Sequence, residues 1–277
     1  MADMDIVEIE TPTLIEGFKC YAPESASINT DFPEQAFDQL FELEARSFWF
    51  RGRQRIIEQM LSRFLHHKKS LFLEVGCGTG FVLRGLQKYK NLWLMGAELH
   101  LEGLKRAKAR VPSIELIQLD ATKIPFRDAF DAIGAFDVVE HIEADDLVFR
   151  QMGAALKAHG FLFLTVPQHM WLWSDRDVKS FHKRRYSRQE LDDKLRQAGF
   201  KVRFVSSFIT LLLPALAFSR LQRDPQRVPG AGHSCELALP VWVDRLFELT
   251  LLVEWMLIRL GFRLPMGGSL IVAAQKQ

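Results

Sequence analysis

A cluster of glycines with an acid beside it stands in LEVGCGTG at residues 73–80. Gly76, Gly78 and Gly80 allow the backbone to turn sharply and to approach a ligand closely, and a helix that starts behind them offers free N–H groups. Their G-x-G-x-G spacing is one residue shorter than the dinucleotide motif G-x-G-x-x-G. Glu74 would repel a pyrophosphate, whereas it suits a cationic amine. The stretch therefore favours an amine-bearing ligand over a dinucleotide, and a tight structural turn is the alternative.

Two further acids end the next two predicted strands. Glu98 follows Gly80 by 18 residues, where such an acid commonly accepts hydrogen bonds from both hydroxyls of a bound ribose. Asp120 ends the following strand, and the small Ala121 after it leaves room for an adenine ring. Because the carboxyl ends of parallel strands meet at one sheet edge, we expect Glu74, Glu98 and Asp120 to lie together. Each acid alone could equally be a solvated strand end.

The segment AFDVVEHI at residues 135–142 follows the fourth predicted strand. Imidazoles titrate near neutral pH, so His141 could act as a general base for a nucleophile. Asp137, Glu140 and His141 stand at i, i+3 and i+4 and would share one face of a helical turn. Asp137 could instead cap the helix, with His141 as a packed polar residue. Both roles of His141 stay open, and we take it as the catalytic candidate.

The segment SDRDVKSFHKRRYSR at residues 174–188 contains six bases and two acids. Arg184 and Arg185 could bind a carboxylate or phosphate in bidentate fashion, or the loop could simply be solvated. Nucleic acid is not expected, because a near-neutral chain with one short basic loop lacks an extended phosphate-binding face. The predicted acceptor-binding residues come from this segment, from positions just before it and from one upstream aromatic position: Trp49, His169, Trp171, His182, Arg185 and Tyr186.

Short apolar strands alternate with amphipathic helices from Ser70 onwards, which is typical of a parallel α/β sheet. The predicted strands are apolar runs that suit burial on both faces, at 71–76, 92–98, 114–120, 130–137 and 161–167. Helical patterns lie between them at 80–89, 101–110 and 144–158. Further along the chain, SRQE at residues 187–190 predicts the start of a helix. Ser187 would be its N-cap, and the Glu190 side chain would accept a hydrogen bond from the Ser187 backbone.

The last two predicted strands, 200–207 and 267–275, enclose about 60 residues that a minimal sheet does not require. An apolar run at 208–218 and a helix near 241–260 that is apolar on most sides lie here. Both stretches could be helices packed in the core. Alternatively, they could form a cap that contacts lipid or a hydrophobic substrate. Upstream, residues 34–66 predict one or two helices.

The composition fits one large globular domain. The chain has 277 residues, 48% of them hydrophobic and 25% charged, with three scattered cysteines that predict neither disulfides nor a structural metal. The longest apolar run has 11 residues and no signal-peptide pattern is visible, so we expect a cytoplasmic protein, with contact to the inner face of a membrane as an option. Residues 1–44 carry a balance of −10 within a net charge of +2, which predicts a solvated, partly mobile leader.

The glycine loop, both downstream acids and AFDVVEHI together resemble the class I S-adenosylmethionine-dependent methyltransferases, over about residues 70–207 and the last strand. The resemblance implies that Glu74 and the loop backbone hold the methionyl part of S-adenosylmethionine. It implies that Glu98 holds the ribose, and Asp120 with Ala121 the adenine. The full implied cofactor-binding set is Glu74, Gly76, Cys77, Gly78, Gly80, Glu98, Leu99, Asp120, Ala121 and Phe136.

Three shorter stretches carry narrower resemblances. The segment 135–142 resembles the D/E-x-x-E-H turn of quinone-type O-methyltransferases, in which such a cluster can hold a divalent ion; here its members would be Asp137, Glu140 and His141. We expect no bound metal and keep this set as the weaker alternative. WFRGR at 49–53 and FHKRRYS at 181–187 resemble a bacterial subgroup whose members act on glycans, lipids or small metabolites.

The resemblance implies a Rossmann-like α/β fold with a doubly wound, mostly parallel seven-stranded sheet and an antiparallel last strand. The expected units are an acidic leader and helical lid at 1–66, a cofactor-binding core at 67–207, an apolar helical insertion at 208–264 and the final strand at 265–277. The expected function is methyl transfer to a small-molecule, lipid-linked or glycan-linked acceptor, with oxygen slightly favoured as the acceptor atom. A nicotinamide-dependent oxidoreductase and a non-catalytic, methyltransferase-like partner subunit are the alternatives.

Overall fold

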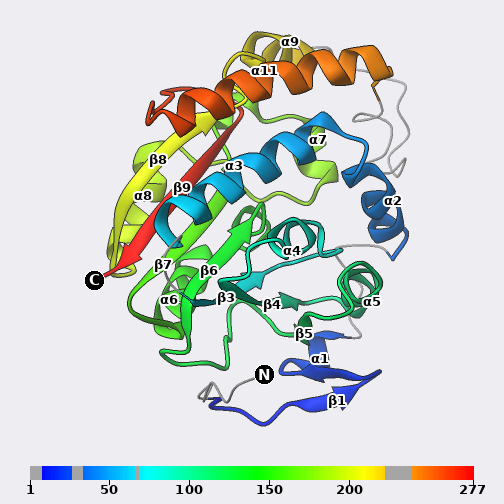
Figure 1. The fold of residues 1–277 in the computed structure, drawn as a ribbon, viewed down its shortest axis with the longest axis vertical. Helices are drawn as coiled ribbons and strands as arrows, with labels where there is room; N and C mark the ends of the chain where they lie inside the picture. Colours follow the sequence, from blue (N-terminus) through cyan, green and yellow to red (C-terminus); the bar gives the residue numbers. More distant parts are fainter. Residues whose placement is uncertain (1–7, 27–33, 66–68, 222–238) are drawn as a thin grey trace.

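A computed structural model describes residues 8–26, 34–65, 69–221 and 239–277. Its strands are β1 Thr13–Ile15, β2 Phe18–Cys20, β3 Ser70–Val75, β4 Leu92–Glu98, β5 Glu115–Gln118, β6 Phe130–Phe136, β7 Leu156–Pro167, β8 Phe200–Phe208 and β9 Ser269–Lys276. They form one sheet in the order β1-β2-β5-β4-β3-β6-β7-β9-β8 (Figure 1). Neighbours from β2 to β7 in this order are parallel, whereas β9 is antiparallel to both β7 and β8.

The seven strands from β5 to β8 in this order confirm the predicted doubly wound sheet with an antiparallel last strand. The chain moves outward from β3 through β4 to β5, then returns to the other side of β3 with β6 and β7. The carboxyl ends of β3 and β6 therefore flank the point where the winding reverses, and the end of β4 lies next to β3. Open α/β sheets bind ligands at such a point.

A hairpin of β1 and β2 extends the sheet beyond the predicted strands. β1 pairs antiparallel with β2, and β2 adds to the edge of the sheet parallel to β5. Cys20 is buried there, and the Gln118 side chain bonds both backbone groups of Ala22, at 3.0 and 2.8 Å. This part of the acidic leader is thus a packed sheet edge and not a solvated tail. The expectation rested on net charge, and strands this short give no periodic signal.

The helices lie close to their predicted places. Their bounds are α1 Pro23–Ala26, α2 Glu34–Glu44, α3 Phe48–Leu65, α4 Phe81–Leu86, α5 Leu101–Arg110, α6 Asp145–Ala155, α7 Asp175–Lys179, α8 Arg188–Gln197, α9 Leu213–Leu221 and α11 Val241–Arg259, with short 3₁₀ turns at Val139–His141 and Met170–Leu172. The region 34–66 contains two helices, α2 and α3. α6 ends earlier than predicted, because β7 begins at Leu156 and pairs with Phe130 before a shift in register.

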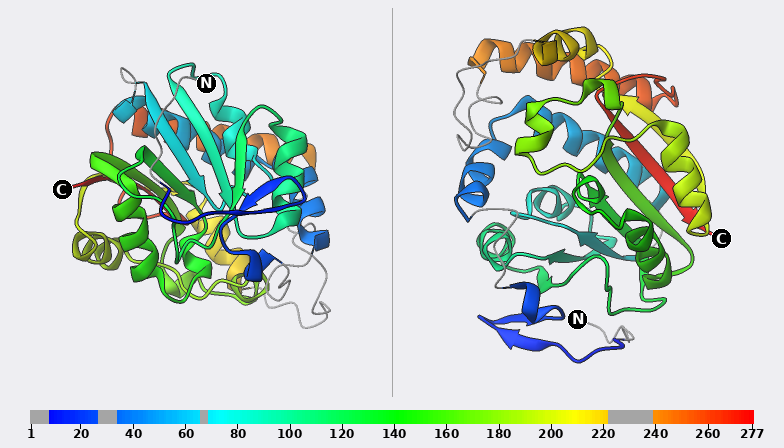
Figure 2. Two further views of the ribbon diagram at one scale, coloured as in Figure 1. Left: turned by 90° about the horizontal axis from the view of Figure 1, so that it is seen from below. Right: turned by 180° about the vertical axis from the view of Figure 1, so that it is seen from behind.

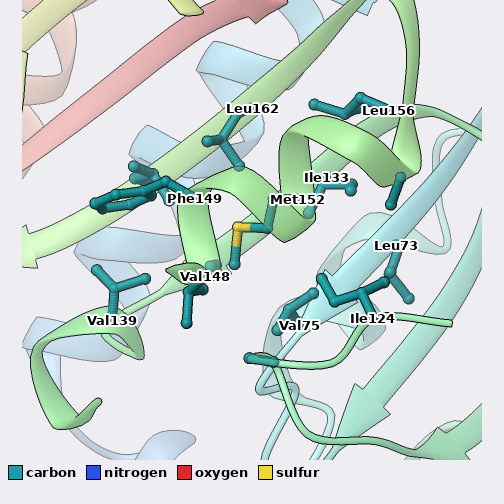
Figure 3. Close-up of a cluster of buried hydrophobic side chains, with 14 of the residues drawn as sticks. Leu73, Val75, Ile124, Ile133, Val139, Val148, Phe149, Met152, Leu156 and Leu162 are labelled. Atoms are coloured by element: carbon teal, nitrogen blue, oxygen red, sulfur yellow. The ribbon is translucent and has the colours of Figure 1, made fainter. Parts of the chain in front are cut away.

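Helices cover both faces of the sheet, so β3 sends alternate residues into two cores. Leu73 and Val75 pack with Phe149 and Met152 of α6 in the core that Figure 3 shows. Phe72 packs in the opposite core, against α3 and α11. Figure 2 shows α3 and α11 on one side of the sheet and α6 with α8 on the other. The strands are buried on both faces, as their uninterrupted apolar runs predicted.

Ser187 caps α8 as predicted. Its hydroxyl accepts from the N–H of Glu190 at 3.1 Å, and the Glu190 carboxylate accepts from the Ser187 N–H at 3.5 Å. A second capping box, unforeseen from the sequence, starts α7 with Ser174 and Asp177. Within the described parts of the chain, no helix is both long and apolar enough to cross a membrane.

Candidate active site

The glycine loop joins β3 to α4 at the carboxyl edge of the sheet. Gly76 has a φ of 70°, and a Cβ there would lie 2.5 Å from a methyl carbon of Val138, so another residue would meet both strain and a clash. Gly78 has a φ of 51°, and a Cβ there would meet no atom within 4 Å, so the space in front of it is open. The loop therefore presents backbone to an open space at a helix start.

Glu98, at the end of β4, holds this loop in place. Its carboxylate accepts from the N–H groups of Gly78 at 2.9 Å, Leu99 at 2.9 Å and His100 at 3.1 Å. His100 is the N-cap of α5, so the charge also lies at a helix start, where a carboxylate is favourable. The sequence suggested a ribose contact for Glu98, and the structure gives the same carboxylate a second role in fixing the loop.

The remaining residues of the predicted cofactor set lie along the same edge. Asp120 is half-buried after β5, and its Oδ1 accepts from both the N–H and the hydroxyl of Thr122 at 2.8 Å. Ala121 beside it is buried. Three other members lie at the ends of β3, β4 and β6: Cys77, Leu99 and Phe136. The topology thus places the set that the resemblance implied along one edge of the sheet, from β5 to β6.

Glu74 is buried in β3, and its Oε2 atom has no hydrogen-bond partner among the described residues. Burial raises the pKa of this carboxyl well above its ordinary value, and the nearby charge of Arg53 opposes that shift. Its partners on the neighbouring strands, Gly96 and Gly134, have no side chains. A buried polar atom without a partner is costly, so a cationic ligand at Glu74 would be stabilised.

Helices α2 and α3 contact the glycine loop and the helix behind it. The hydroxyl of Thr79 donates to Glu44 of α2, and Arg110 of α5 donates to the same hydroxyl and forms an ion pair with Glu44. Gln54 of α3 donates to the carbonyl of Val82 at 3.3 Å. The N-terminal helices are therefore attached to the loop by buried polar contacts as well as by packing.

Arg53 of α3 is a candidate functional residue that the sequence reasoning missed. Its guanidinium forms an ion pair with Asp137 and lies 4.5 Å from the ring centre of Trp49 and 5.3 Å from that of Phe50. Trp49 is half-buried beneath this cation. The i, i+4 spacing of Trp49 and Arg53 on one helix was the available signal. The pairing with Asp137 joins two segments 84 positions apart, which no local pattern reveals.

Glu140, His141 and His182 form a polar cluster after β6, with one ligand-type atom from each within 4.8 Å of the others. The rings of His141 and His182 meet edge to face, with centroids 4.8 Å apart. Glu140 is fully buried, and neither of its carboxylate oxygens has a partner among the described residues. Asp137, which the weaker metal alternative included, is instead paired with Arg53, and His182 stands in the cluster.

Asp177 of α7 organises the basic segment. Its Oδ1 lies 3.0 Å from Nδ1 of His182 and accepts from Nε of Arg185 at 2.7 Å. Although burial raises it, these hydrogen bonds hold the pKa of Asp177 far below its ordinary value. Arg185 is buried and also donates to the carbonyl of Gln168 at 3.1 Å. Arg185 thus binds other residues of the protein, whereas the sequence predicted that it would contact the acceptor.

Tyr186 also departs from its expected role as an acceptor contact. It is fully buried, and its hydroxyl donates to Asp145 at 2.7 Å, so it belongs to the core. Arg184 pairs with the same Asp145 at 2.9 Å. His169 is half-buried and stacks on the exposed Trp171, with centroids 5.6 Å apart. Of the predicted acceptor-binding residues after β7, His169, Trp171 and His182 retain accessible surface.

Comparisons with known proteins agree with this geometry. Residues 73–164 match the family model of a methyltransferase domain. A Mycobacterium tuberculosis protein named as a probable S-adenosylmethionine-dependent methyltransferase is 25% identical over 162 residues, which cover 57% of this chain and 58% of that protein. A chloroplastic 2-methyl-6-phytyl-1,4-hydroquinone methyltransferase of Oryza sativa is 26% identical over 141 residues, covering 50% of this chain and 43% of that protein. The chain thus spans less than two thirds of these curated relatives.

The fold is also found among solved structures. Phosphoethanolamine N-methyltransferase 2 of Haemonchus contortus, solved with S-adenosyl-L-methionine, has a TM-score of 0.58 at 16% identity, covering 90% of this chain and 58% of that chain. At this identity the likeness shows the fold alone. Domain match, sequence relatives and fold agree with one another and with the glycine loop and its acids: residues 73–164 form a methyltransferase domain that is similar to those of S-adenosylmethionine-dependent methyltransferases.

Proposed function

We propose that this protein transfers a methyl group from S-adenosylmethionine to a small-molecule or lipid-linked acceptor. The observation that carries the proposal is the meeting of the glycine loop, Glu98 and the buried, unpartnered Glu74 at one sheet edge. These residues fit a nucleoside with a cationic amine. When bound, the cofactor supplies an electrophilic methyl group on a sulfonium. The protein must then hold the acceptor in line with that methyl and remove a proton where the acceptor carries one.

His141 is the residue we assign to proton removal, with an acceptor oxygen as the favoured nucleophile. It lies after β6, at the same sheet edge as the cofactor set, and its ring contacts His182. Asp177 in turn holds Nδ1 of His182. Such an arrangement fixes the orientation of one imidazole beside another, which supports transfer of a proton away from the acceptor. A divalent ion between the two imidazoles and Glu140 is the competing assignment.

An exposed apolar face supports the lipid-linked part of the proposal. Its members come from α9, α11 and the segments just before α9 and just after α11, and the two helices lie side by side in Figure 1 and Figure 2: Leu211, Phe218, Trp242, Leu246, Leu249, Val253, Met256, Leu260, Phe262 and Met266. Three exposed bases accompany them, Arg245, Arg259 and Arg263, and no exposed acid occurs among the described residues from 209 to 268. Apolar and aromatic side chains with bases alone suit the interface of an anionic membrane.

Transfer of labelled methyl groups tests the proposal directly. The purified chain would be incubated with methyl-labelled S-adenosylmethionine and a panel of hydroxyl, amine and carbon acceptors, each in a water-soluble and a lipid-linked form. We expect labelled product from one acceptor class, with hydroxyl acceptors first. Cofactor binding without transfer to any member, including the lipid-linked ones, would favour the non-catalytic partner subunit instead.

A further inference from the structure

Helix α9 has two unlike faces. Leu216 and Arg220 are four residues apart and share one face of the helix, while Pro214 and Phe218 share the opposite face. Leu216 packs against the core and the Arg220 side chain is 15% exposed, whereas Pro214 and Phe218 are both exposed. One face of α9 therefore belongs to the exposed apolar surface, and the other faces the interior of the protein.

Arg220 connects the inner face of α9 to α7. Its Nη1 donates to the hydroxyl of Ser174 and to Oδ2 of Asp177, the latter at 3.3 Å. Ser174 is the N-cap of α7, and Asp177 completes the capping box of that helix. Because a capping box fixes the first turn of a helix, Arg220 contacts the two residues that place α7.

The Asp177 carboxylate joins α9 to the histidine cluster. Its Oδ2 accepts from Arg220, and its Oδ1 lies 3.0 Å from Nδ1 of His182. The ring of His182 in turn meets the ring of His141, with centroids 4.8 Å apart. Because both oxygens belong to one planar group, a change of position at Oδ2 also moves Oδ1, and the His182 ring with it.

Few contacts hold α9 in place. No side chain at residues 213–220 is fully buried. Just before the helix, the N–H of Leu211 donates to the buried Glu254 of α11 at 2.6 Å, which ties the start of α9 to α11. A helix with little buried apolar surface has a low local stability, so its position responds to whatever covers its outer face.

An anionic membrane fits the outer face of α9 and α11. Phe218 and Trp242 are exposed there, as are the bases Arg245 and Arg259, and no exposed acid occurs among the described residues from 209 to 268. The apolar side chains would enter the interface, and the bases would pair with anionic head groups. Contact with such a membrane would hold α9 in one position, and Arg220 with it.

We propose that Arg220 is a positioning residue of the acceptor site, and that contact of α9 with an anionic membrane acts through it on Asp177 and His182. The inference rests on the proposed function, because it takes the apolar face and the histidine cluster from there. Lipid on the outer face of α9 stabilises the bonds that Arg220 makes on the inner face. The membrane-bound protein therefore methylates faster than the protein in solution, even when the acceptor is water-soluble.

Turnover on a water-soluble acceptor separates this effect from a gathering of substrate at the lipid surface. The acceptor is one that the panel identifies, and the vesicles contain phosphatidylglycerol in phosphatidylcholine, at low salt. These vesicles should raise kcat of the wild-type chain by about 2- to 30-fold, the range for coupling through a network of side chains. Vesicles of phosphatidylcholine alone should leave kcat unchanged. The affinity for S-adenosylhomocysteine should not respond to either lipid, because the coupling ends at the histidine cluster.

Variants separate positioning by Arg220 from membrane binding itself. Arg220→Met should float with the anionic vesicles as the wild type does, but its kcat should not rise. Arg220→Lys keeps a cation at this place and should recover part of the rise. Arg245→Met, which removes an exposed base from the same apolar face, is the matched control. It should need more anionic lipid to float and should show the full rise once bound.

The ring of His182 reports the coupling without any acceptor. Histidines would be isotope-labelled for nuclear magnetic resonance, and His182→Gln would assign the signal. Nanodiscs of the same anionic lipid mixture should shift the His182 signal in the wild type but not in Arg220→Met.

Three results would overturn the inference: a wild-type chain that does not float, a His182 signal that stays unshifted in the lipid-bound wild type, or a rise in kcat that Arg220→Met retains. A chain that binds no S-adenosylhomocysteine and methylates no acceptor would instead contradict the proposed function. The resonance comparison would still decide the inference in that case, because it needs neither cofactor nor acceptor.

Discussion

Buried carboxyl groups dominate the electrostatics of the site at the scale of single residues. Burial raises the pKa of Glu74 and of Glu140 well above their ordinary values, and the nearby charge of Arg53 opposes both shifts without cancelling them. A ligand ammonium at Glu74 would favour the ionised form. Cofactor binding at Glu74 would therefore be linked to the loss of a proton from this carboxyl.

Binding of S-adenosylhomocysteine should release a proton and strengthen as pH rises. The sign follows because the ammonium binds the carboxylate, and a raised pKa leaves less carboxylate at lower pH. The raised pKa also means that the folded, ligand-free protein favours protonated Glu74. The stability of the ligand-free protein should therefore fall as pH rises through this pKa. Calorimetry in buffers of different ionisation enthalpy counts the proton. If the Glu74→Gln variant released the same number of protons on binding, Glu74 would not be their source.

Glu98→Ala should weaken cofactor binding by about 10- to 150-fold, equivalent to ~1.5–3 kcal/mol for a hydrogen bond to a charged group. The variant removes the acceptor for three backbone N–H groups that shape the loop as well as the expected ribose contact. Glu102→Gln is the matched control, since its carboxylate pairs with Lys105 on α5. Unchanged affinity in Glu98→Ala would refute both roles.

His141→Ala should lower turnover by ~10²–10⁴-fold, the usual contribution of general-base catalysis, with cofactor affinity intact. Turnover would be measured with the acceptor that the panel identifies. Near-normal turnover would exclude His141 as the base. Activity lost with a chelator and restored by a divalent ion would favour the ion between Glu140, His141 and His182.

At this scale, the sequence predicted the residues whose roles follow from spacing within one segment. Glu74, Glu98 and Asp120 follow predicted strands, and parallel topology brings strand ends together whatever else the chain does. Side-chain pairing between remote segments has no such rule. The ion pair of Arg53 with Asp137 and the placement of His182 beside His141 therefore emerged only from the structure.

At the scale of elements, α3 and α11 are joined by a close helix contact. A Cβ on Gly52 of α3 would lie 2.4 Å from Cδ1 of Leu251, and Leu251 is buried. The absence of a side chain at Gly52 thus lets the two helices approach. Because α3 also carries Arg53 and Gln54, this contact helps to place the residues that reach the glycine loop.

Gly52→Ala should lower the free energy of unfolding by about 1–3 kcal/mol, because the clash outweighs the better helix propensity of alanine. Leu251→Ala alone should cost about 2–5 kcal/mol as a cavity. Adding Gly52→Ala to Leu251→Ala should cost little or nothing more, since the clashing atom is gone. Denaturant unfolding of the four proteins measures the cycle, and an equal cost of Gly52→Ala in both backgrounds would contradict the packing argument.

Long periodic elements were predictable and short ones were not. The buried strands, the capped α8 and the helix near 241–260 carry patterns that hold over many residues. The hairpin at Thr13–Cys20 is stabilised by tertiary contacts at the edge of the sheet, so its own residues do not predict its two strands. The early start of β7 likewise depends on its pairing with β6.

At the scale of the whole molecule, charge and apolar surface are unevenly distributed. The helices α9 and α11, which carry the apolar face, lie at one end of the molecule in Figure 1, and the hairpin of β1 and β2 lies at the other. The first 44 residues carry −10, so the remainder of the chain carries +12. An anionic membrane would therefore attract the body of the molecule and accept its apolar face.

The chain should float with anionic liposomes at low salt and less completely at physiological salt, because screening weakens the attraction of its bases. Leu246→Glu/Leu249→Glu should abolish flotation, since both side chains are exposed on α11. Leu14→Glu, at a still more exposed apolar position on the distant hairpin, is the control and should leave flotation unchanged. Protein that stays unbound in both salts, yet methylates a water-soluble acceptor, would leave the apolar face without a membrane role.

The identity of the bound nucleoside is the central claim, and one titration tests it most directly. The purified chain would be titrated calorimetrically with S-adenosylhomocysteine and, separately, with NADH. Glu74, the short glycine spacing and the loop held by Glu98 predict binding of one S-adenosylhomocysteine per chain and no heat from NADH. Binding of NADH with no response to S-adenosylhomocysteine would contradict the account and favour the oxidoreductase alternative.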